Sequence, residues 1–143
     1  MLVINGKASV VAYSELIAAR IVNAVKADAI KIEFVDDKKA APAVFNDEST
    51  DAFSKIINDY PEIFSQGVTS EVADFVKISR ENLVVKNFQK LASSLEHLDT
   101  VLNLRTFLLG GIKYSPADIA CWGALRSNGM VGSIIKNKVY VNV

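Results

Sequence analysis

The chain of 143 residues contains one histidine, His97, and one cysteine, Cys121, and these are the side chains best suited to reactive chemistry. Histidine titrates near neutral pH, and a cysteine thiolate is a strong nucleophile. His97 lies beside an apolar stripe, with Lys90 and Ser93 on its own side, so we expect it at the surface. Cys121 follows Ala120 inside a capped helical segment, so we expect a buried, unreactive thiol. One cysteine and one histidine provide no Cys/His set for structural zinc.

The sharpest local pattern is Ser115-Pro116-Ala117-Asp118. A serine at the N-cap, a proline at the first helical position and an acidic residue at N3 form an acidic version of the capping box. The sequence therefore predicts a helix that begins here, ends at Asn128-Gly129, and is fixed in place by Ser115 and Asp118. We expect Ile119, Trp122 and Leu125 on its core-facing side.

Before this helix, the first half of the chain has a mixed pattern. An apolar run predicts a strand at residues 2–4, and apolar residues at helical spacing without glycine or proline predict a helix at 13–25. Ile30, Ile32 and Phe34 alternate with charged residues, which predicts a second strand with one exposed face. The three elements form a βαβ unit, followed by a loop at 36–42 and a helix at 51–58 that Pro61 interrupts.

After Gly67 the pattern is helical almost throughout, so we place a boundary there and expect two parts, residues 1–67 and 68–143. Thr69 or Ser70 can cap the first helix of the second part. The longest apolar seam has spacings of four, three, four, three and four residues and consists of Val84, Phe88, Leu91, Leu95, Leu98 and Leu102. Such a seam must be buried, and we favour an intramolecular core over a coiled coil with a partner because it spans only about three heptads.

Composition excludes several functional classes. Sixteen basic and sixteen acidic residues give a formal net charge of zero, which argues against a nucleic-acid surface that works by counterion release. No apolar run has the length of about 18 residues that a membrane span needs, and the N-terminus lacks a secretion signal. A single cysteine cannot form an internal disulfide and is typical of a reducing compartment, so we expect a cytoplasmic protein.

Longer stretches of the sequence resemble a known family. An Arg105-Thr106-Phe107-Leu108 segment followed by glycines and by Ser115-x-Ala117-Asp118 resembles the glutathione-transferase fold. More specifically, four stretches look like the N-terminal appended domain of fungal cytosolic glutamyl-tRNA synthetase, namely residues 11–24, 102–115, 117–130 and 132–138. The resemblance implies an α+β to all-α fold in which a reduced thioredoxin-like βαβ half, 1–67, precedes an all-helical half, 68–143. It also implies a further helix after Val143, so we expect the chain to be truncated.

The resemblance implies a docking function. Such domains bind the transferase-like N-domain of a tRNA-binding synthetase cofactor and so join a complex with methionyl-tRNA synthetase. The chain lacks the histidine-containing signature and the lysine-rich loop with which class I synthetases hold ATP, so we expect no catalysis and no cofactor in this chain; ATP with Mg²⁺ would serve the parent glutamate–tRNA ligase. In related domains the partner contacts come from the turn between the first two helices of the helical half and from the helix expected after Val143, or alternatively from the face used by transferase dimers. On this sequence the resemblance places the turn at Arg80, Glu81 and Asn82. Arg126, near the end of the capped helix, is a further candidate because arginine suits interface ion pairs.

Two alternatives remain open. A glutathione-dependent transferase needs a hydroxyl or thiol near the first strand–helix turn to stabilise the glutathione thiolate, and Ser9, Tyr13 and Ser14 are candidates. We favour structural roles for all three because we find no strand pair between Asp36 and Gly67 to complete the glutathione pocket. The second alternative is a structural domain that self-associates through the face used by transferase dimers.

Overall fold

A short apolar strand, β1 (Leu2–Asn5), forms the centre of a three-stranded sheet in the computed structural model of the chain. The structure describes residues 1–8, 10–37, 39–64, 69–84, 87–103, 107–109 and 114–128. Strand β1 pairs in parallel with β2 (Ile32–Val35) and antiparallel with β3 (Ala43–Phe45), so the strand order is β2-β1-β3. Helix α1 (Tyr13–Val25) connects the two parallel strands. The predicted βαβ unit is therefore confirmed.

The second strand begins two residues later than its apolar alternation predicts. The side chain of Asn23 donates to the carbonyl of Ile30 and accepts from its N–H, both at 2.9 Å, so the backbone of Ile30 bonds to α1 and not to the sheet. Ile30 is nevertheless buried, whereas Phe34 is 61% exposed. The prediction that Phe34 shares a buried face with Ile30 is thus wrong.

Strand β3 lies in the segment where the sequence indicates no strand. It has only three residues, and Asn46 and Asp47 directly after it adopt positive φ angles of 49° and 66° in a tight turn. Three residues are too short a run for a period-2 pattern to be recognised. The predicted loop at 36–42 ends where this strand begins.

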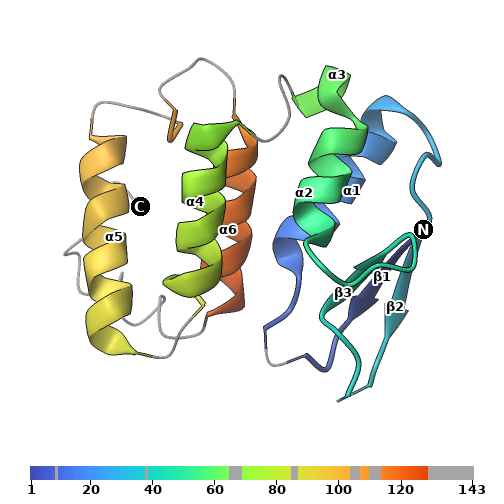
Figure 1. Cartoon of the computed structure of the whole chain (residues 1–143), viewed down its shortest axis with the longest axis horizontal. Coiled ribbons are helices and arrows are strands. Elements are labelled where there is room, and N and C mark those ends of the chain that lie inside the picture. The colour runs from blue at the N-terminus through green and yellow to red at the C-terminus, as the bar shows by residue number, and fades with distance from the viewer. Residues whose placement is uncertain are drawn as a thin grey trace.

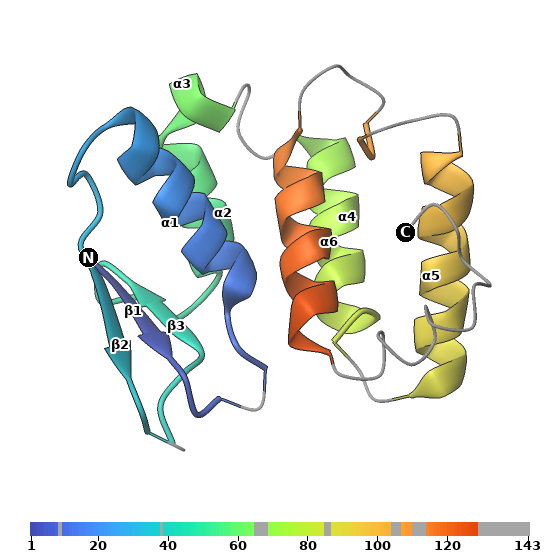
Figure 2. The ribbon, with the colours of Figure 1, turned by 180° about the vertical axis from the view of Figure 1, so that it is seen from behind.

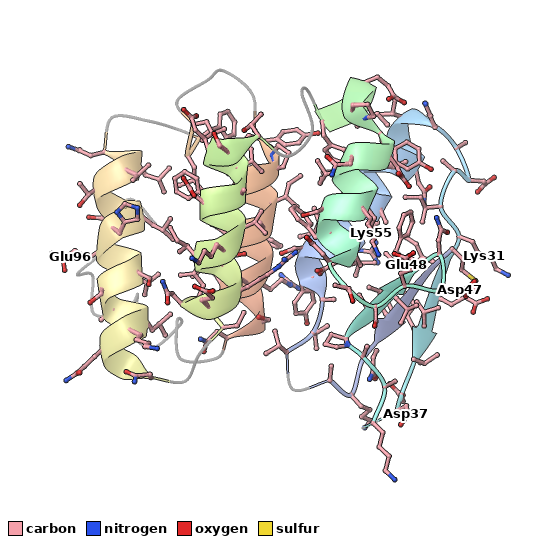
Figure 3. The ribbon with its side chains drawn as sticks, viewed as in Figure 1. Lys31, Asp37, Asp47, Glu48, Lys55 and Glu96 are labelled. Carbon is pink, nitrogen blue, oxygen red and sulfur yellow. The ribbon has the colours of Figure 1, made fainter. Side chains whose placement is uncertain are left out.

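Two helices follow the sheet. Helix α2 (Ala52–Asp59) begins at Asp51, whose carboxylate accepts from the N–H of Ser54 at 3.2 Å, and Pro61 opens the short helix α3 (Pro61–Phe64). Helices α1 and α2 pack against each other and against the sheet (Figure 1). At the surface of this half, Lys55 forms an ion pair with Glu48 (Figure 3).

The second half consists of the helices α4 (Ser70–Glu81), α5 (Phe88–Leu102) and α6 (Pro116–Ser127). Thr69 caps α4 as expected, by accepting from the N–H of Val72 at 3.3 Å. Helix α5 begins at Phe88, so Val84 of the predicted seam lies outside it, but Leu91, Leu95 and Leu98 are almost completely buried. The seam is therefore an intramolecular core, as predicted, and the outer face of α5 is polar, with Glu96 pointing away from the molecule (Figure 3).

The two halves meet along α1 and α6, which lie side by side (Figure 2). Ile119 and Ala120 of α6 belong to the core around the sheet, whereas Cys121 and Ala124 belong to the core with the leucines of α5. Helix α6 therefore serves both cores. The boundary at residue 67 remains a prediction, because residues 65–68 lie outside the described part.

Candidate docking surface

A cleft of about 210 Å³ lies where the first turn of α1 meets the C-terminal ends of α4 and α6. Apolar side chains such as Val11, Phe53 and Val76 form much of its wall. Tyr13 and Ser14, two of the three candidates for a thiolate-stabilising hydroxyl, border this cleft, and Ser9 lies outside the described residues. The contacts of Tyr13 and Ser14 therefore show whether either hydroxyl group already has a partner within the fold.

Ser14 joins the two halves of the molecule. Its hydroxyl donates to the backbone carbonyl of Ala120 in α6 at 3.0 Å. The two helices approach so closely here that a Cβ atom on Gly123 would lie 2.7 Å from the Cα of Ser14. Because the proton of this hydroxyl is already committed to Ala120, Ser14 has a structural role between the helices.

Tyr13 forms part of an exposed cluster with α6. The guanidinium of Arg126 lies 5.2 Å from the centre of the Tyr13 ring and 5.4 Å from the centre of the Trp122 ring. Both distances are typical of cation–π contacts. Trp122 is 52% exposed, so the prediction that it faces the core is wrong. Small residues, Gly123 and Ala120, occupy the side of α6 that contacts Ser14 of α1, and the fold leaves the larger Trp122 ring partly uncovered.

Arg80 also borders the cleft, but its charge is paired within the molecule. Its guanidinium forms a hydrogen-bonded ion pair with Asp51, the N-cap of α2, so it connects α4 with the sheet-containing half. Partial burial of Asp51 alone would raise the pKa of its carboxyl. Hydrogen bonds from Arg80 and Ser54 outweigh this effect, and the pKa is lowered.

Glu15, in the first turn of α1, is the carboxylate of the cleft. Burial raises the pKa of its carboxyl, because a charged group is poorly solvated there; its own backbone N–H and the charge of Arg80 oppose the rise without cancelling it. The charge of Arg80 therefore acts on two carboxylates from different elements. It stabilises the charged form of both.

Glu81 and Asn82 follow Arg80 at the end of α4. Glu81 is exposed, and Asn82 is the C-cap residue, with its N–H donating to the carbonyl of Ile78 at 2.9 Å. Asn82 borders a shallow cavity with the first turns of α5. The structure thus keeps three of the four proposed contact residues together, while Arg126 lies on a different helix with the aromatic cluster.

Asp118 connects two segments of the helical half. Its carboxylate accepts from the N–H of Ser115 at 2.8 Å and from the Ser115 hydroxyl at 3.1 Å, within the capping box. Its other oxygen accepts from the N–H of Leu108 at 2.9 Å. Asp118 therefore positions the start of α6 and also fixes the chain before it, a second contact that the sequence pattern does not indicate.

The two residues with reactive side chains have the surroundings that the sequence predicts. Cys121 is 3% exposed, its Sγ lies 3.7 Å from the carbonyl oxygen of Phe75, and burial together with the nearby Asp118 raises the pKa of its thiol to about 12. His97 is exposed and borders a cavity of about 440 Å³ between α4 and α5. Neither arrangement resembles a nucleophile next to its base.

The described residues contain neither a metal-binding cluster nor a membrane-spanning helix. No cluster of three or more His, Cys, Asp or Glu side chains there could hold a metal ion. No helix in the same part of the chain is long and apolar enough to cross a membrane.

Comparison with known proteins places these features in a family. The sequence profile of the glutamate–tRNA ligase N-terminal domain matches residues 20–61. The cytoplasmic glutamate–tRNA ligase of Saccharomyces cerevisiae is 61% identical over 142 residues, which cover 99% of this chain and 20% of the relative. The probable cytoplasmic glutamate–tRNA ligase of Schizosaccharomyces pombe is 27% identical over 155 residues, covering 96% and 21%. The chain thus spans about a fifth of the length of these relatives.

A solved structure is similar over nearly the whole chain. It matches with a TM-score of 0.96 and 61% identity, and the match covers 99% of this chain and 80% of that chain. That structure was determined in a crystallographic study of two binary sub-complexes that explain how the yeast aminoacyl-tRNA synthetase complex forms. These matches confirm the resemblance inferred from the sequence and the predicted α+β fold.

Proposed function

The chain belongs to the family of glutamate–tRNA ligase N-terminal domains, and on this premise we propose that it is a non-catalytic docking module that brings its parent ligase into a complex of synthetases. The parent enzyme would attach glutamate to its tRNA with ATP and Mg²⁺, in a catalytic part that lies outside this chain. The module itself would use no cofactor. Because both relatives are named cytoplasmic, we assign the module to the same compartment.

The observation that carries this proposal is the likeness to a structure from a study of synthetase complex formation. The cleft supports the non-catalytic part of the proposal. Of the two described candidates for thiolate stabilisation, Ser14 donates its hydroxyl proton to Ala120, and the ring of Tyr13 lies against Arg126. A transferase would need one of them directed at a substrate thiol.

The proposed partner is the transferase-like N-domain of a tRNA-binding cofactor, through which the module would also be linked to methionyl-tRNA synthetase. Tethering raises the effective concentration of tRNA near the catalytic part without any new contact at the active site. A module with a net charge of zero suits this function, because the partner would supply the basic surface for tRNA. The module would contact tRNA only indirectly.

The experiment that tests the proposal mixes the purified module with the cofactor N-domain and measures sedimentation velocity and titration calorimetry at micromolar concentrations. We expect a 1:1 complex. Two proteins that sediment separately would contradict the proposed partner. Retention of the module on immobilised glutathione, with turnover of chlorodinitrobenzene, would instead favour the transferase alternative.

A further inference from the structure

Half-buried Tyr13 and the exposed residues Trp122 and Arg126 form a cluster at the surface, beside the cleft. We propose that Arg126, held between these two aromatic rings, is the centre of a docking patch that binds a carboxylate side chain of a protein partner. This inference rests on the proposed docking function. It adds the location of one contact surface and the type of side chain, a carboxylate, that the partner would place there.

The geometry prepares Arg126 for such a contact. Its guanidinium lies 5.2 Å from the centre of the Tyr13 ring and 5.4 Å from that of Trp122, so aromatic surface covers part of the planar group. A guanidinium that stacks on rings keeps N–H donors along its edge, and these match the two oxygens of a carboxylate. Stacking also restricts a long, flexible side chain before the partner arrives, which reduces the entropy lost on binding.

The charge of Arg126 is available for a partner. Among the described residues no carboxylate forms an ion pair with it, although Arg80, Lys26 and Lys55 each pair with one. Tyr13 and Trp122 cannot neutralise the charge. An acidic side chain is therefore the complementary group, and the neutral net charge of the chain disfavours the alternative of a nucleic-acid phosphate.

The composition of the patch is that of an interface centre. Tryptophan, tyrosine and arginine are the residue types enriched among those that dominate binding energy at protein interfaces. Trp122 is 52% exposed, so the fold leaves about half of this large side chain uncovered.

The test measures the affinity of the module for the cofactor N-domain in four variants by titration calorimetry. We expect Arg126→Ala to weaken binding by about 30-fold and Trp122→Ala by about tenfold, because both remove an interface centre. Arg126→Lys keeps the charge but loses the planar donor edge, so we expect a loss of about tenfold as well. The matched control is Arg20→Ala, an exposed arginine of α1 outside the patch, which should bind within about twofold of the wild type.

Two readouts separate the possible results. The midpoint of thermal unfolding should stay unchanged in all four variants, since the altered side chains are exposed.

If the wild type forms the complex and the Arg126 and Trp122 variants bind equally well, the proposed patch is wrong and the docking function stands. If the wild type forms no complex, the proposed function fails and this inference fails with it. A further outcome is that Arg126→Ala alone loses self-association or tRNA binding. The patch would then bind a second copy of the chain or tRNA, and the proposal of an acidic protein partner would be wrong.

Discussion

The two faces of helix α6 differ in what their residues contribute. The face toward α1 and α4 carries small residues, among them Ala120, Cys121 and Gly123, and all of them are buried. The exposed side carries Trp122 and Arg126, and the guanidinium of Arg126 lies 5.4 Å from the centre of the Trp122 ring. At Gly123 the inner face leaves no space for an added atom, whereas the exposed side carries large side chains that the fold leaves partly uncovered.

We therefore expect the residues of α6 that determine stability to differ from those that determine binding. Substitutions on the inner face should affect the unfolding free energy, and substitutions on the outer face should affect partner affinity. The same contrast holds between the two arginines that were both expected to contact a partner. Arg80 is paired with Asp51, whereas Arg126 contacts the rings of Tyr13 and Trp122 and forms no ion pair with a described carboxylate.

The largest expected effect concerns the reactivity of Cys121. With a thiol pKa of about 12 in the fold against about 8.5 for free cysteine, the thiolate fraction at pH 8 is smaller by about three orders of magnitude. We expect dithiobis(nitrobenzoate) to label the native protein slower than the urea-unfolded protein by at least this factor. The control comes from the outer face: Trp122 is the one tryptophan of the chain, and acrylamide should quench its fluorescence readily in the native state. Fast labelling of the native thiol would contradict the buried inner face.

The next largest effect is expected for Gly123→Ala. The added Cβ would lie 2.7 Å from the Cα and 2.5 Å from the backbone nitrogen of Ser14, and backbone atoms cannot rotate away. We expect the free energy of unfolding to fall by about 3 kcal/mol, measured by urea denaturation. Gly6→Ala is the matched control, because a Cβ there lies 3.0 Å from the end of the Asp36 side chain and at an ordinary contact distance of 3.9 Å from the carbonyl oxygen of Val35. It should change stability by less than about 1 kcal/mol. Equal effects of the two substitutions would show that the close approach of α1 and α6 does not determine stability.

Removing the carboxylate of Asp118 should have a somewhat smaller effect. Asp118→Ala leaves the N–H groups of Ser115 and Leu108 without their acceptor, and we expect a loss of about 2 kcal/mol in unfolding free energy. Asp74→Ala, an exposed acidic residue of α4, controls for the change in charge and should cost less than about 0.5 kcal/mol. A loss no larger than that of the control would mean that the capping contacts are replaced by water.

The sequence predicted the elements that depend on local chemistry. The capping residues before α6, the leucines of α5 and the first βαβ unit follow from spacing and residue type, and the structure contains all three. Features that depend on distant segments were missed. Strand β3 exists because β1 offers it a free edge, and Trp122 is exposed because the close approach of α1 requires Gly123 and Ala120 on the inner face.

In the candidate site, too, the features that depend on distant segments could not be predicted from the local sequence. Arg80 and Arg126 are both arginines near a helix C-terminus, and nothing in their sequence neighbourhood distinguishes them. Their difference arises from Asp51 and Tyr13, which lie 29 and 113 residues away in the chain. The spacing of four residues between Trp122 and Arg126 could have indicated a shared exposed face.

Arg80→Ala, compared with Arg126→Ala, tests whether this difference matters in solution. The Arg80–Asp51 pair is partly exposed, so solvent screens it, and we expect a loss of only about 0.5 kcal/mol in unfolding free energy at pH 7. Because the pKa of Asp51 is lowered in the fold, the contribution of the pair is present above the ordinary aspartate pKa and disappears as the pH falls through the lowered value. Affinity for the cofactor N-domain should not change in Arg80→Ala. Weaker binding with unchanged stability would return Arg80 to the docking surface.

The smallest effect is expected for Glu15→Gln, and its sign is informative. Burial raises the pKa of Glu15, so the fold favours the protonated form, and this contribution to stability is present below the ordinary glutamate pKa and lost as the pH rises through the raised value. Glutamine is neutral at every pH, so Glu15→Gln should raise the midpoint of thermal unfolding slightly at pH 7.5 and leave it unchanged near pH 4. A lower midpoint at pH 7.5 would mean that attraction between Arg80 and the charged Glu15 exceeds the desolvation penalty. In that case Arg80 would hold two carboxylates at the cleft, and its removal should cost more than the pair with Asp51 alone predicts.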